Sequence, residues 1–96
     1  MLWREFDWDE GNQSKIKSRF SIEDVEQFFA QDLYVIHDTA HSKNEDRMIA
    51  VGQGPNNKPM FVCYTLRGSK IRVISARYMS IKEAKRYEAF KEKDQK

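Results

Sequence analysis

The chain alternates short apolar blocks with polar segments, and the spacing inside each block indicates a strand or a helix. From Trp3 to Trp8 side chains of opposite character alternate, which predicts a short edge strand with Phe6 and Trp8 facing the core. Asp9 follows at once, and its carboxylate suits the N-cap of a short helix over about residues 10–17.

A second helix is predicted immediately afterwards. Ser21 precedes Glu23 and Asp24, a capping signal with an acidic first turn that complements the helix dipole. Apolar residues then recur at helical spacing, so this helix should pack one apolar face on a sheet. These residues are Ile22, Val25, Phe28 and Phe29.

The middle of the chain contains blocks of strand length separated by turn signals. The expected strands are residues 33–37, 47–52, 60–64 and 71–77, the last two rich in apolar and β-branched side chains. A polar loop, 40–46, separates the first two, and Gly54-Pro55-Asn56-Asn57 predicts a hairpin turn. Gly68 provides the next turn because it tolerates positive φ.

A capping box from Ser80 to Glu83 predicts the final helix, expected to bury Ile81, Ala84, Tyr87 and Phe90. The order of elements predicts an α+β domain, an antiparallel meander sheet packed against helices on one face. We expect a single domain over residues 1–90 and a frayed, charged tail at 91–96.

Composition narrows the class of protein. With 40% hydrophobic and 33% charged residues among 96, the chain is typical of a small globular domain. No apolar run approaches the roughly 20 residues that a membrane helix needs, and the first ten residues lack a signal-peptide layout. The single cysteine, Cys63, lies in an apolar strand and is interpreted as a small buried hydrophobe. We therefore expect a cytoplasmic protein without a membrane partner.

Charge is unevenly distributed along the chain. The net charge is +2, but residues 1–65 hold seven Lys/Arg and eleven Asp/Glu (−4), whereas residues 66–96 hold ten and four (+6). This asymmetry suggests a polyanion or an acidic partner for the C-terminal third. A solvated Lys/Glu helix face at 82–93 explains the lysines equally well.

Arg72 and Arg77 stand in an inner strand, where an unpaired charge is costly. Two readings stay open, a phosphate-binding surface or ion pairs with Glu45, Asp46 or Glu83. If Ile71 and Val73 face the helices, Arg72 faces the open side of the sheet, and Arg77 falls on the opposite side in a regular strand. A shared cationic surface therefore requires a β-bulge or the strand's end near residues 75–77.

Other chemistry is weakly signalled. Tyr64, Tyr78 and Tyr87 could stack on bases, although such spacings are more typical of a core. His37 and His41 are four apart but lack further ligands, so we expect loop histidines and no metal site. No catalytic triad, glycine-rich phosphate loop or zinc spacing is present. A set of guanidinium groups fits RNA phosphates, and could support metal-free attack of a 2′-hydroxyl on its neighbouring phosphate.

The chain resembles the BrnT family of small bacterial toxins over about residues 6–88. The matching pieces, in order, are Phe6-Asp7-Trp8-Asp9-Glu10, Ser21-Ile22-Glu23 with Phe29, Glu45-Asp46-Arg47 leading into Ile49 and Gly52, Tyr64-Thr65-Leu66-Arg67, Ile71-Arg72-Val73-Ile74-Ser75-Ala76-Arg77, and Glu83 with Tyr87. The order and spacing of these pieces make the resemblance more specific than any single motif.

The resemblance implies a fold similar to the RelE ribonucleases, whose open sheet face binds RNA. It also implies a translation-blocking ribonuclease that uses no cofactor, is neutralised by a BrnA-like antitoxin in a hetero-oligomer, and contacts operator DNA only through that antitoxin. The implied catalytic residues are Glu45, Arg47, Arg72, Arg77 and Tyr87. The resemblance also carries over Tyr64, which we expect to contact RNA. From their positive charge we expect four further residues to bind RNA, namely Lys17, Arg19, Arg67 and Lys70.

One element of the family pattern is missing. Many members carry Lys-His-Gly before the second helix, whereas this chain reads Lys17-Ser18-Arg19-Phe20 and is about two residues shorter. If that histidine is a general base in relatives, another group must serve here or catalysis is weakened. Two further functions therefore remain open. The protein could bind the antitoxin without cleaving RNA and act as co-repressor of their operon, or it could be an RNA-binding domain that does not cleave.

Overall fold

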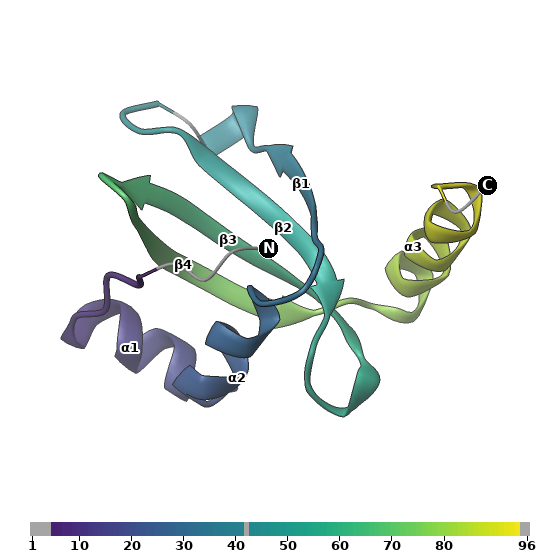
Figure 1. Ribbon diagram of the computed structural model, residues 1–96, viewed down its shortest axis with the longest axis horizontal. Helices are drawn as coiled ribbons and strands as arrows, with labels where there is room; N and C mark the ends of the chain where they lie inside the picture. The colour runs from purple at the N-terminus through teal and green to yellow at the C-terminus, as the bar shows by residue number, and fades with distance from the viewer. Residues whose placement is uncertain (1–4, 42, 95–96) are drawn as a thin grey trace.

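The computed structural model describes residues 5–41 and 43–94 and has the predicted α+β architecture, with two helices, a four-stranded antiparallel meander and a third helix (Figure 1). The helices are α1 (Glu10–Lys17), α2 (Ile22–Phe28) and α3 (Ile81–Asp94). The strands are β1 (Tyr34–His37), β2 (Arg47–Gln53), β3 (Pro59–Arg67) and β4 (Lys70–Tyr78). Two short 3₁₀ turns, Thr39–His41 and Pro55–Asn57, lie between strands. No helix in the described part of the chain is both long and apolar enough to cross a membrane.

Local signals place the first two helices as expected. The Asp9 carboxylate accepts a hydrogen bond from the Asn12 backbone N–H at 3.1 Å, and the Asn12 side chain accepts one from the Asp9 N–H at 2.8 Å. Both hydrogen bonds of a capping box are therefore present. The Ser21 hydroxyl accepts the Asp24 N–H at 3.0 Å and starts α2. Val25 and Phe28 are buried on the helix face turned to the sheet.

The expected N-terminal edge strand is reduced to one bridge. Phe6 pairs with Ile71 in a parallel bridge, in which Ile71 accepts the Asp7 N–H at 2.8 Å and donates to Glu5 at 2.9 Å. Phe6 and Trp8 pack against the core, as predicted. The first two residues of the predicted strand, Trp3 and Arg4, lie outside the described residues.

The sheet has a closed face and an open face. Strand order is β1-β2-β3-β4. Helix α1 lies along the β4 edge, and α1 and α2 contribute Ile16, Val25 and Phe28 to the core on the closed face. On that face Ala50, Met60, Val62 and Val73 are at most 1% exposed. Pairing registers arrange the opposite, open face in three rows across the strands. The first row is Tyr34, Val51, Phe61 and Arg77; the second is Ile36, Ile49, Cys63 and Ser75; the third is Arg47, Thr65 and Arg72.

A β-bulge in β4 places both strand arginines on the open face. Tyr64 pairs with Val73 while Cys63 pairs with Ser75, so Ile74 is the extra residue. The parity of the strand changes there, and Arg77 pairs with Phe61 rather than turning toward the helices. The predicted bulge is confirmed, and it lies at Ile74, one residue before the expected range of 75–77.

Helix α3 is placed differently from α1 and α2. It stands apart from them in Figure 1, and its Tyr87 and Phe90 rings contact Tyr34 at centroid distances of 6.1 and 4.8 Å. Only Met79 and Ser80 connect it to β4, too few residues to return beneath the sheet. Tyr87 is buried as expected, but the expected burial of Ile81 and Phe90 is wrong, since they are 79% and 53% exposed. The helix continues to Asp94, past the residue at which we expected fraying to begin.

Candidate nucleic-acid interface

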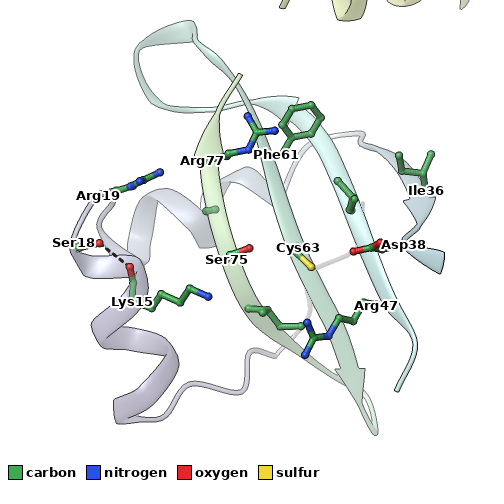
Figure 2. A pocket seen from close by; sticks show the side chains of 13 residues that line it. Lys15, Ser18, Arg19, Ile36, Asp38, Arg47, Phe61, Cys63, Ser75 and Arg77 are labelled. Atoms are coloured by element: carbon green, nitrogen blue, oxygen red, sulfur yellow. Dashed lines mark hydrogen bonds between the residues drawn. The ribbon is translucent and has the colours of Figure 1, made fainter. Parts of the chain in front are cut away.

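The open face carries a pocket of about 640 Å³ between α1 and β1 (Figure 2). Its floor is the second row of the open face, Ile36, Ile49, Cys63 and Ser75, together with the bulge residue Ile74. Four cationic side chains line it, Lys15 from α1, Arg19 from the α1–α2 connection, Arg47 from β2 and Arg77 from β4. An apolar floor with a cationic rim suits a ligand that combines flat rings with negative charge.

Helix α1 reaches this pocket because a buried amide fixes it beside β4. The Asn12 side chain, 7% exposed, donates to the backbone carbonyls of Asp7 at 3.0 Å and Val73 at 3.1 Å. Lys15 lies in the last turn of α1 and Arg19 follows the C-cap Ser18, and both side chains line the pocket. Within the described residues neither forms an ion pair, which leaves two cations available for an anionic ligand.

The sequence reasoning named Arg19 but missed Lys15. Lysine on a polar helix is common, and only the i, i+4 spacing to Arg19 linked the two residues. The docking of α1 on the β4 edge, which turns that spacing into a cationic rim, depends on contacts distant in sequence.

Arg77 is held by three partners, Glu83, the Tyr78 carbonyl and the Phe61 ring. Its guanidinium forms a bidentate pair with Glu83, Nη1 to Oε1 at 2.9 Å and Nη2 to Oε2 at 3.0 Å, and donates to the Tyr78 carbonyl at 3.3 Å. It also lies over the Phe61 ring, 4.7 Å from the centroid. Arg77 and the Ser80 backbone N–H lower the pKa of Glu83 from 4.5 to about 2, and the bond to Glu83 raises the pKa of Arg77.

Arg72 shares the open face but does not line the pocket. Its side chain is 19% exposed and pairs with Asp9 at 2.9 Å and Asp7 at 3.7 Å. The pKa of Asp9 is lowered, first by the Asn12 backbone N–H and then by Arg72. Both strand arginines therefore form ion pairs. Arg77 pairs with Glu83, one of the three expected acids, whereas Arg72 pairs with Asp7 and Asp9, which were not expected.

The remaining charged candidates lie around or away from the pocket. Glu45 is 3.7 Å from both Arg47 and Arg67, which places it beside a pocket-lining residue without lining the pocket itself. Lys70, at the β3–β4 turn, is 4.0 Å from Glu5. Lys17 lies in a separate shallow hollow between α1 and α2, so it does not join Arg47 and Arg77.

The two tyrosine candidates belong to packed clusters. Tyr64 contacts Phe29 edge to face, with centroids 5.3 Å apart, on the closed face of the sheet. Tyr87 packs against Tyr34, and burial first and Glu88 second raise the pKa of its hydroxyl. Neither ring is among the residues that line the pocket. Tyr78 likewise packs on Phe20, at 5.0 Å.

Two pocket residues carry chemistry that the sequence reasoning did not assign to a site. Cys63 is half-buried in the pocket floor rather than in the core, and burial, together with the charge of Asp38, raises the pKa of its thiol. Asp38 is the only carboxylate among the described residues that line the pocket. His37 points elsewhere, with Nε2 3.3 Å from Asp46. In the sequence, Asp38 directly follows the strand predicted at 33–37, and loop positions next to a strand often carry functional residues.

A family model matches most of the chain. The model of the family described as the ribonuclease toxin BrnT of type II toxin–antitoxin systems matches residues 8–83, which include α1, the whole sheet and Glu83. No curated protein matches the chain, so the assignment rests on the family model. The matched segment covers well over half of the chain, and the protein belongs to the BrnT family of ribonuclease toxins.

Proposed function

We propose that the protein is an endoribonuclease that cleaves RNA at the open-face pocket without a metal ion and thereby blocks translation in the cytoplasm. The observation that carries this proposal is the cationic rim of the pocket, in which Lys15 and Arg19 have no ion-pair partner among the described residues. Two uncompensated cations beside an apolar floor favour an RNA backbone whose bases lie on the sheet.

The chemistry that suits this pocket is internal transfer at phosphorus. The 2′-oxygen bonds to the adjacent phosphorus as the bond to the 5′-oxygen breaks, which leaves a 2′,3′-cyclic phosphate and a 5′-hydroxyl. The 2′-hydroxyl loses its proton to a base, and the departing 5′-oxygen gains one. Guanidinium and ammonium groups stabilise the additional negative charge that develops on the phosphate oxygens.

Asp38 is the best-placed proton acceptor. It lines the pocket, whereas Glu45 does not and is 3.7 Å from the guanidinium groups of both Arg47 and Arg67. Ser18, which stands in the region where relatives carry a histidine, cannot act as a base of that kind and donates its hydroxyl to the Lys15 carbonyl at 2.9 Å. Asp38→Asn should therefore reduce cleavage more than Glu45→Gln does, at equal thermal stability.

The experiment that tests the function is cleavage of purified RNA in EDTA. Wild-type protein should cut, and the double variant Lys15→Ala/Arg19→Ala should cut roughly 10–100-fold more slowly because it lacks both free cations. Lys82→Ala, which removes an exposed lysine from α3, is the matched control and should cut normally. Cleavage that requires a divalent ion would contradict the proposal.

A second function is favoured by the absence of a histidine near Ser18. In this alternative the protein no longer cleaves RNA and serves as the partner of a BrnA-like antitoxin, in a hetero-oligomer that represses their operon through the antitoxin's DNA contacts. Induced expression without the antitoxin distinguishes the two functions, since only the ribonuclease should arrest growth.

A further inference from the structure

The guanidinium of Arg77 is only partly occupied by its protein partners. An arginine side chain has five N–H donors, and the contacts to Glu83 and the Tyr78 carbonyl use both hydrogens of Nη1 and one of Nη2. No described residue accepts a bond from Nε or from the second hydrogen of Nη2. On a planar guanidinium these two N–H groups share one edge, and that edge matches two oxygens of a phosphate.

The orientation of this free edge is fixed by its neighbours. The Phe61 ring restrains the plane of the guanidinium, and the two carboxylate contacts from Glu83 restrain its rotation within that plane. Arg77 at the same time lines the open-face pocket (Figure 2). A side chain that is 51% exposed is thus held in one direction, although solvent would otherwise let it move freely.

Glu83 is itself held in place by the start of α3. The Ser80 N–H donates to Glu83 Oε1 at 2.8 Å, and the Ser80 hydroxyl accepts the Glu83 N–H at 3.2 Å. The same carboxylate oxygen therefore caps the helix and binds Arg77. Because its pKa is about 2, the carboxylate stays ionised at neutral pH.

We infer that Glu83 is a positioning residue for the RNA-cleavage site. Resting on the proposed function, the inference is that Glu83 does not touch RNA but directs the free Nε/Nη2 edge of Arg77 toward the scissile phosphate. Fixed donors stabilise developing charge without reorganising during the reaction, so the loss of Glu83 should affect the rate of cleavage more than the affinity for RNA.

The test compares Glu83→Gln with Glu92→Gln, the same change at an exposed position further along α3. Single-turnover cleavage should fall roughly 10–100-fold in Glu83→Gln, as small displacements of catalytic groups can cost. The Kd for 2′-O-methyl RNA, which has no attacking hydroxyl, should stay within about threefold of wild type, because Arg77 keeps its charge. Glu92→Gln should match wild type in both measurements.

Two results would overturn the inference. Faster cleavage by Glu83→Gln would mean that Glu83 competes with the phosphate for Arg77. Equal losses in cleavage rate and affinity would mean that it supports binding only. Glu83→Asp keeps the charge but shortens the side chain, so its cleavage rate should lie between those of wild type and Glu83→Gln. The cleavage rates of all variants should be compared at a temperature at which every variant is folded.

An NMR measurement separates failure of this inference from failure of the proposed function. If wild-type protein does not cleave RNA, the proposed function is contradicted, and titration with 2′-O-methyl RNA still tests the role of Glu83. The Arg77 Nε–H resonance should shift on binding in wild type and in Glu92→Gln, and should broaden without a defined shift in Glu83→Gln. An identical response in Glu83→Gln would contradict a positioning role.

Discussion

Arg72 and Arg77 lie on the same strand and the same face of the sheet, yet their surroundings differ. Arg72, near the start of β4, is 19% exposed and is enclosed by the carboxylates of Asp7 and Asp9 from the N-terminal segment. Arg77, near its end, is 51% exposed, lines the pocket and has one carboxylate partner, Glu83. Two nearby carboxylates neutralise a guanidinium, whereas a single bidentate partner orients it and leaves one edge for a ligand.

The comparison predicts opposite consequences for the same substitution. Arg77→Gln should abolish growth arrest on induced expression, while Arg72→Gln should retain it at comparable protein levels. Antitoxin binding in a pull-down should persist for both variants if each remains folded. Loss of toxicity in Arg72→Gln, with its fold intact, would show that the enclosed arginine also serves the reaction.

The cations near Arg77 should dominate binding to RNA. Lys15→Ala/Arg19→Ala should weaken binding of 2′-O-methyl RNA about tenfold at 0.1 M salt and reduce the slope of log Kd against log salt by roughly 1.4, the value for two contacts on a single strand. Fluorescence anisotropy over a salt series measures both quantities. An unchanged slope would mean that the backbone runs elsewhere.

Arg72 should matter more for stability than Arg77. Its removal leaves Asp7 and Asp9 close together without a counter-charge at the point where the N-terminal segment bridges to Ile71. We expect Arg72→Gln to lower Tm by roughly 4–8 °C, which corresponds to about 1 kcal/mol in a domain of this size. Thermal unfolding followed by circular dichroism should show a smaller change for Arg77→Gln.

The Arg77–Glu83 pair should contribute to how the free energy of unfolding changes with pH on the acid side. The folded pKa of Glu83 is lowered from 4.5 to about 2, so the contribution of the pair is present above pH 4.5 and is lost as pH falls from about 4.5 to about 2. Glu83→Gln should therefore lose less stability than wild type over this range, whereas Glu92→Gln should retain the wild-type profile. Urea unfolding at several pH values measures the difference.

Local signals in the sequence were sufficient for much of the fold. The capping residues Asp9 and Ser21 started helices where expected, and Gly68, with φ of +62°, turns β3 into β4. These features depend on neighbours a few residues away. A bulge or strand end near residues 75–77 followed from the hypothesis that Arg72 and Arg77 share one face, and the bulge lies at Ile74.

Features that depend on distant contacts were not predictable in the same way. Asp7 and Asp9 are more than sixty positions from Arg72, and their pairing follows from the bridge between Phe6 and Ile71. The closed-face position of Tyr64 follows from its register with Val73, so an exposed stacking role could not be separated from packing by spacing alone. Residue type indicated a cationic surface, and tertiary contacts decided which cations reach the pocket.

The most direct test of the pocket is the cleavage of a long transcript in EDTA by wild type, Arg77→Gln and Arg72→Gln at matched concentrations. We predict 2′,3′-cyclic phosphate ends from wild type and Arg72→Gln, and a cleavage rate for Arg77→Gln that is lower by roughly 100-fold or more. Equal cleavage by wild type and Arg77→Gln would contradict the assignment of the open-face pocket as the site of RNA cleavage.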